Sequence, residues 1–150
     1  MLIVPASAVD GAVDHALARR WLSCVHTSVR GRPGPRPVVG GLSAPGPGWN
    51  SYSVRVELAG GRPYRILLNA ASRTVAASDD GGAPLLGPLT FVDLPHPGPF
   101  LAAGFTVPTA DQLSEALTAE HLAALTPAGR ADVDYHRAER VGDLFYNWFD

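Results

Sequence analysis

The chain contains no lysine, and all of its 12 basic side chains are arginine. Without lysine, the protein cannot form a Schiff base with a carbonyl substrate or with pyridoxal phosphate, and it has no Walker-type phosphate loop. Its single cysteine, Cys24, cannot form an intramolecular disulfide. One thiolate is also too few for a four-cysteine zinc or iron–sulfur site within one chain. These absences exclude several enzyme classes, and we expect no bound cofactor.

Long apolar runs are absent as well. A membrane-spanning helix needs roughly 18 consecutive apolar residues, and no segment approaches that length. The amino-terminal segment has a short apolar run before Pro5 and no basic residues ahead of it, so we expect no signal peptide. The net charge of -2 gives little attraction to nucleic acids or to anionic membranes. We therefore expect a cytoplasmic protein that binds neither of them.

The composition is typical of a folded globular protein. Hydrophobic residues make up 46% of the sequence and charged residues 17%, and 150 residues can bury a core in a single domain over 1–150. Alanine, glycine, proline and arginine are abundant, whereas isoleucine and glutamine are scarce. This bias is typical of proteins from GC-rich bacterial genomes such as those of actinobacteria.

The clearest pattern in the sequence is that of β-strands. Apolar and polar residues alternate over 52–58 with the period of a half-buried strand, and the glycine pair at 60–61 supplies a tight turn. Two further strands are predicted at 64–68 and 74–77. The segment 51–78 is therefore predicted to form an antiparallel meander with one apolar face.

An amphipathic helix is predicted before this meander, over residues 11–26. Asp10 has the position of an N-cap, and an apolar stripe with helical spacing follows it. The stripe consists of Val13, Leu17, Trp21 and Cys24. We expect it to cover one face of the sheet. Residues 30–50, which follow, are rich in glycine and proline and predict a loop, with a short strand near 38–39.

The last third of the chain carries helix-capping signals. Thr109 and Gln112 have the spacing of a capping box, and Thr118 and Thr126 precede further short helices. The predicted elements are helices at 110–117, 119–125 and 127–131, and a short edge strand within 89–94. Together with the meander they predict an α+β fold. Its small antiparallel sheet of three to five strands is covered by the N-terminal helix and several short C-terminal helices.

The chain ends in an apolar stripe, where a polar and frayed end is usual. A helix predicted over 141–149 carries large apolar side chains on one face: Val141, Leu144, Phe145, Trp148 and Phe149. Burying one such side chain stabilises by roughly 1.5–3 kcal/mol, which outweighs the tendency of a short helix to fray. We expect the tail to dock on the protein's own core. The alternative is a surface for self-association or for a partner.

Two groups of residues are candidates for binding a partner. Arg30, Arg32 and Arg36 lie close together on the Gly/Pro-rich loop, and guanidinium groups bind carboxylates and phosphates in a bidentate manner. Trp49 after the loop and Trp148 in the tail add aromatic surface. The pattern predicts an anionic partner, and a solvated loop without a ligand is the alternative.

An acid–base pair points to a different class of protein. Asp134 and His136 lie in a polar segment just before the tail, and a carboxylate can orient an imidazole and raise its pKa. No nucleophile or electrophile accompanies them at a recognisable spacing, so we assign no catalytic residue. The alternative is that these residues form salt bridges at the solvent-exposed start of a helix.

Other motifs are incomplete. His96, His121 and His136 match no metal-binding spacing, so we assign no metal ligand unless the fold brings them together. The segment GLSAPG resembles a nucleophile elbow, but Pro45 replaces its second glycine. The sequence therefore predicts a non-catalytic protein-binding module, an inhibitor- or immunity-type partner of another bacterial protein, with homo-oligomerisation a further possibility. The alternative is a small cofactor-independent enzyme that uses Asp134 and His136.

Overall fold

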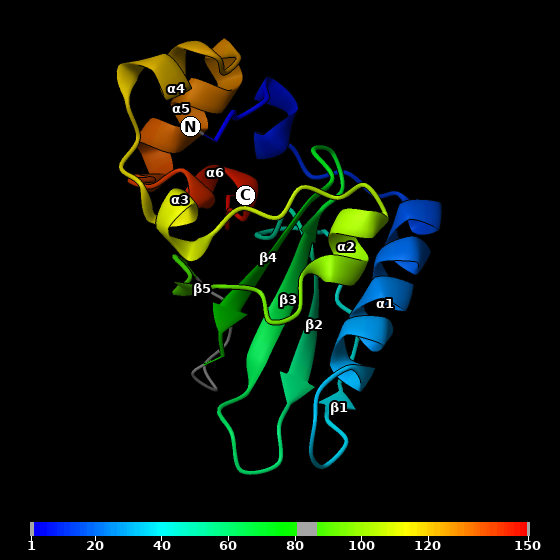
Figure 1. Cartoon of the computed structure of the whole chain (residues 1–150). Helices are drawn as coiled ribbons and strands as arrows, with labels where there is room; N and C mark the ends of the chain where they lie inside the picture. The colour runs from blue at the N-terminus through cyan, green and yellow to red at the C-terminus, as the bar shows by residue number, and fades with distance from the viewer. Residues whose placement is uncertain (1, 81–86, 150) are drawn as a thin grey trace.

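The computed structural model describes residues 2–80 and 87–149 and shows an α+β fold (Figure 1). A five-stranded antiparallel sheet lies at its centre, with the strands ordered as in the chain. The strands are β1 (Val38–Val39), β2 (Tyr52–Glu57), β3 (Tyr64–Asn69), β4 (Thr74–Asp79) and β5 (Phe91–Val92). The meander predicted over 51–78 is confirmed, and the short strands predicted near 38–39 and within 89–94 are the two edges of the sheet.

Helices cover both faces of this sheet. They are the 3-10 helix η1 (Ala6–Val9) and the α-helices α1 (His15–Arg30), α2 (Gly98–Ala102), α3 (Ala110–Ser114), α4 (Ala119–Ala123), α5 (Pro127–His136) and α6 (Gly142–Phe145). α1 and α2 lie on one face, whereas η1 and the C-terminal helices gather against the other (Figure 1). No helix among the described residues is long and apolar enough to cross a membrane.

The central strand β3 is buried on both of its faces. Ile66, Leu67 and Leu68 are all 0% exposed. Ile66 and Leu68 belong to the core beneath α1 and α2, whereas Leu67 belongs to a second core with the C-terminal helices. Side chains alternate between the two faces of a strand, so consecutive buried residues require a cover on each side. The prediction of one apolar face was therefore incomplete, because the sheet separates two cores.

The first long helix, α1, begins later than predicted and spans residues 15–30 rather than 11–26. Its N-cap is Asp14, whose carboxylate accepts a backbone N–H of the first turn at 3.0 Å, and not Asp10, which ends η1. The Asp14 N–H also donates to the Tyr52 hydroxyl at 3.0 Å. A residue of the sheet thus fixes where the helix starts, and helical periodicity carries no signal of that contact.

The C-terminal helices begin where the capping signals predicted. The hydroxyls of Thr109, Thr118 and Thr126 each accept a backbone N–H of the helix that follows. α3 and α4 are shorter than predicted. α3 ends early because the chain beyond it pairs with a distant segment, the Val141 N–H donating to the Glu115 carbonyl at 2.9 Å. Tertiary hydrogen bonds therefore override the local helical pattern at this end.

The tail packs into the second core of its own chain, which confirms the prediction of intramolecular docking. Leu144 is 0% exposed and Phe145 is 1% exposed. The predicted helix over 141–149 is wrong, because α6 ends at Phe145 and the chain then leaves the helical path. Trp148 and Phe149 remain half-buried. The apolar stripe is thus divided into a buried part and a partly exposed end.

Three buried amides explain where the tail goes after α6. The backbone N–H of Asn147 donates to the side-chain oxygen of Asn50 at 2.8 Å. The side-chain amides of Asn147 and Asn50 donate to the carbonyls of Val9 and Ala8 at 2.9 and 3.0 Å. Asn69 on β3 donates to the Ala8 carbonyl at 2.8 Å and to the Phe145 carbonyl at 2.7 Å. A buried amide without partners costs roughly 1–3 kcal/mol. These bonds therefore favour an extended tail end over a longer helix.

Two substitutions test this division of the tail. Phe145→Ala is expected to lower the free energy of unfolding by about 3–5 kcal/mol, because it empties a fully packed site. Trp148→Ala is expected to cost about 1 kcal/mol, because part of that ring is already in water. Urea unfolding followed by circular dichroism measures both values. Equal losses for the two variants would contradict the division.

The alkaline stability of the protein tests the burial of Tyr146. Burial raises the pKa of the Tyr146 hydroxyl well above its ordinary value. The unfolded chain releases this proton at about pH 10. The folded protein retains it, because the Tyr146 hydroxyl donates it to the Thr74 carbonyl at 2.8 Å. The contribution of Tyr146 to stability is therefore complete below about pH 10 and falls as the pH rises further.

Urea unfolding on either side of about pH 10 measures this loss. Tyr146→Phe should flatten the profile, leaving the dependence of Tyr64 and Cys24, whose pKa values burial also raises. The same alkaline slope in the wild-type protein and in Tyr146→Phe would show that another group causes it.

Candidate functional site

Two of the predicted arginines line a hollow between α1 and the edge strand β1. Arg30 is the last residue of α1, and Arg36 lies on the loop just before β1. The hollow has a volume of about 440 Å³. Its lining consists of Ser23, His26, Val29, Arg30, Arg36, Pro37 and Val39. We call it the arginine hollow, and Figure 1 shows β1 beside the C-terminal end of α1.

Helical spacing and a tight chain reversal bring these side chains together. His26 and Arg30 are four residues apart on α1, so they share one face of the helix. The Arg30 Nε donates to the His26 carbonyl at 3.2 Å, which keeps the arginine stem along that face. Beyond α1 the chain turns back through Gly34, whose φ of 99° favours glycine, and returns as β1. Arg36 is thereby placed opposite the end of α1.

The arginine hollow is positively charged, although the whole chain has a net charge of -2. Two guanidinium groups and an imidazole line it, and no carboxylate of the described residues does so. Four other arginines, Arg55, Arg62, Arg65 and Arg140, have acidic partners, as in the 2.6 Å ion pair between Arg55 and Asp80. Arg30 and Arg36 form no ion pair within residues 2–80 and 87–149. The hollow therefore favours an anion.

Arg32 does not join the other two arginines. It is half-buried and hydrogen-bonded to the hydroxyl of Tyr64 on β3. Burial raises the pKa of Tyr64, and the hydrogen bond and the charge of Arg32 lower it in part. Arg32 thus holds the loop against the sheet, and the predicted group of three arginines is divided between two roles.

The edge strand β1 offers backbone groups beside the hollow. The Gly40 N–H donates to the Arg55 carbonyl at 2.7 Å, so Gly40 and Arg55 form a hydrogen-bonded pair. The neighbouring pair, Val39 and Val56, is then a non-hydrogen-bonded pair, and the N–H and C=O of Val39 point away from β2. Neither group has a hydrogen-bond partner in the part of the chain that the structure describes. β1 is therefore an open sheet edge.

The two predicted tryptophans lie away from the arginine hollow. Trp49 lines a different hollow of about 370 Å³, together with Asp10, Asp132 and Phe149. Its indole Nε1 is buried and has no hydrogen-bond partner among the described residues. Trp148 packs its edge against Phe149, with ring centroids 5.5 Å apart at an angle of 71°. The structure thus separates the aromatic candidates from the arginine candidates.

The structure does not bring Asp134 and His136 together. α5 runs on to His136, beyond the predicted end at 131, and places both residues on one helix. Residues two apart on a helix project about 200° apart around its axis, so they face different directions. The His136 ring stacks on Phe149 at 4.6 Å and contacts Tyr135 at 4.9 Å. No hydrogen bond or ion pair joins Asp134 to His136 in the described structure.

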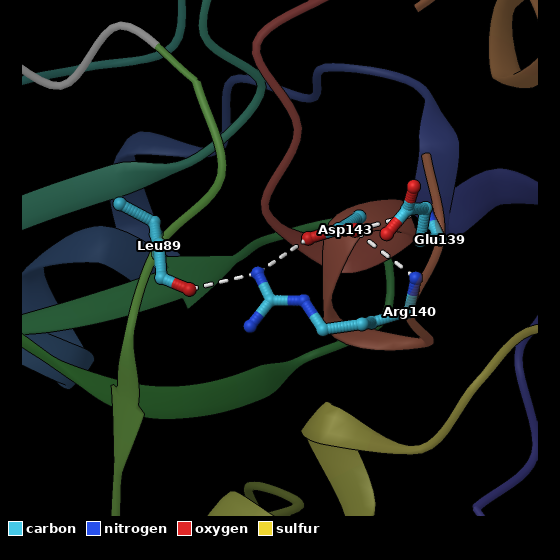
Figure 2. Close-up of polar contacts among 4 residues, drawn as sticks. All are labelled: Leu89, Glu139, Arg140 and Asp143. Carbon is cyan, nitrogen blue, oxygen red and sulfur yellow. Dashed lines mark hydrogen bonds and ion pairs between the residues drawn. The ribbon is translucent and has the colours of Figure 1, made fainter. Parts of the chain in front are cut away.

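The end of the same polar segment forms a structural clamp (Figure 2). One Asp143 oxygen accepts the Arg140 guanidinium at 2.8 Å, and the other accepts the backbone N–H groups of Arg140 and Glu139 at 3.0 and 3.1 Å. Arg140 also donates to the Leu89 carbonyl at 2.7 Å. Both oxygens of this buried carboxylate are therefore occupied within the chain. The clamp fixes the start of the tail.

The histidines and the cysteine form no reactive cluster. Across the described ranges, no three His, Cys, Asp or Glu side chains lie close enough to hold a metal ion, so His96, His121 and His136 are not brought together. Burial raises the pKa of the Cys24 thiol, and the charge of Arg20 lowers it only in part. A thiol with a raised pKa is a poor nucleophile at neutral pH.

Comparison with known protein families, curated proteins and solved structures gave no match to this chain. The candidate site is therefore defined by its geometry. Sequence reasoning identified Arg30 and Arg36 but missed His26 and the backbone of Val39. The helical spacing between His26 and Arg30 was a usable signal. No sequence signal marked the open edge at Val39, because that edge depends on the pairing register between β1 and β2.

Removing the clamp carboxylate tests whether it has a structural role. Asp143→Ala leaves the partly buried Arg140 without its acidic partner and is expected to cost about 3 kcal/mol of unfolding free energy. Asp134→Ala, which removes an exposed carboxylate, should change it by less than about 0.5 kcal/mol. Urea unfolding compares the two variants, and a small effect at both positions would contradict the clamp.

Proposed function

We propose that the protein is a non-catalytic protein-binding module, an inhibitor- or immunity-type partner of another protein, and that the arginine hollow is its recognition surface. The observation that carries this proposal is the absence of acidic side chains, in the described lining, around Arg30, Arg36 and His26. Guanidinium groups bind carboxylates through two parallel hydrogen bonds, which gives both affinity and orientation. The hollow is suited to acidic side chains of a partner.

The composition of the lining favours a protein partner over a nucleic acid. Val29, Pro37 and Val39 provide apolar surface beside the charges, as is typical of protein interfaces. A nucleic-acid site usually presents a long basic stripe that follows several phosphates. Here two guanidinium groups line one hollow of a chain whose net charge is -2. Recognition of a local acidic group on a protein surface fits this distribution.

Paired charge variants test the proposed function. The tagged protein is used to capture binding proteins from a lysate of its native cells, beside Arg30→Gln/Arg36→Gln and the control Arg130→Gln/Arg137→Gln. The control removes the same charge from exposed positions on and just after α5. We expect one stoichiometric partner with the wild-type protein and the control, and about tenfold less with the hollow variant, as expected for the loss of about 1.4 kcal/mol.

Circular dichroism must first show that all three proteins are folded. A partner that binds the hollow variant as well as the wild-type protein would refute the role of the arginine hollow. The absence of any stoichiometric partner would refute the binding-module proposal. Capture of a second copy of this chain would assign the surface to self-association instead.

A further inference from the structure

We propose that the partner contributes an extended acidic segment that pairs with β1 as an added strand. This inference rests on the proposed function and names the form that the partner takes at the same surface. Two independent observations support it. The N–H and C=O of Val39 point outward without partners in the described structure, and two unpaired guanidinium groups lie beside them.

The free edge has the geometry that strand addition requires. An added strand would lie about 4.8 Å from β1 and accept and donate hydrogen bonds at Val39. α1 and α2 cover the face of the sheet toward which the Val39 side chain packs, and the arginine hollow lies between α1 and β1. Every second side chain of the added strand would therefore face the flank of α1 that carries His26 and Arg30.

The same geometry explains why the segment must be acidic. β1 spans only Val38–Val39, and Pro37 before it has no N–H to donate. Backbone pairing is therefore limited to a short stretch, and short pairing by itself is weak. Arg30 and Arg36 supply the remaining attraction through charge-assisted hydrogen bonds. Carboxylates at alternate positions of the segment would meet this need.

The test uses a fluorescent peptide of alternating glutamate and threonine, with binding measured by fluorescence anisotropy. Two single variants separate backbone pairing from side-chain contact. Val39→Pro removes the outward N–H and leaves the bonds to β2 intact, because Val39 does not donate to β2. Val39→Ala removes the same side chain but keeps the N–H. Thermal unfolding must confirm that both variants are folded.

Both Val39 variants lose the apolar side chain that lines the hollow, so Val39→Ala is the reference for Val39→Pro. We expect Val39→Pro to bind the peptide about tenfold more weakly than Val39→Ala, and Arg30→Gln/Arg36→Gln to bind it about tenfold more weakly than the wild-type protein. A peptide of alternating glutamine and threonine should show a similar loss. Binding should also weaken as salt is added, because the hollow retains some exposure to solvent.

The outcomes separate this inference from the proposed function. Full peptide binding by Val39→Pro, together with loss in the arginine variant, would overturn strand addition and leave a hollow that binds acidic side chains. No binding of the peptide to the wild-type protein, with an arginine-dependent partner still captured from lysate, would also overturn only the strand. Preferential binding of single-stranded oligothymidine would overturn a protein segment as the occupant.

Discussion

Three buried asparagine amides hold both ends of the chain on one face of the sheet, and the second core depends on them. Asn69 donates one hydrogen bond to the N-terminal segment and one to the tail. Asn50, just before β2, joins the same two segments, and the Asn147 amide of the tail donates to the Val9 carbonyl. Each amide would be costly to bury without both partners, so docking of one end favours docking of the other. Segments far apart in sequence are thereby made interdependent.

This closure determines which part of the sheet stays uncovered. α1 and α2 cover one face, and η1 with the C-terminal helices covers much of the other (Figure 1). At one edge, β5 lies against α3. At the opposite edge, β1 has no further strand among the described residues. A sheet that is covered on both faces offers backbone hydrogen bonds only along a free edge. Val39 of this edge also lines the arginine hollow, so the open edge and the hollow form one continuous surface.

Local patterns predicted the parts of the fold that local physics controls. The alternation of apolar and polar residues predicted the meander, and the threonine N-caps predicted where the C-terminal helices begin. The errors lie where tertiary contacts decide: Asp14 caps α1 because of Tyr52, and Asn147 draws the tail out of its helix. The candidate site was predictable only as a set of arginines. Its shape depends on a chain reversal and a pairing register that no short segment encodes.

Arg55, Arg62 and Arg65 of the meander have acidic partners, whereas Arg30 and Arg36 have none among the described residues. In the meander, Arg55 meets Glu57 and Asp80, so burial of its stem is accompanied by charge compensation. Arg30 and Arg36 share a hollow whose described lining holds no acidic side chain, so their charges have no ion-pair partner there. Natural sequences break a local stability rule mainly where binding requires it. Pro37 and the shortness of β1 discourage unselective strand pairing, so the charges would supply the selectivity for an acidic segment.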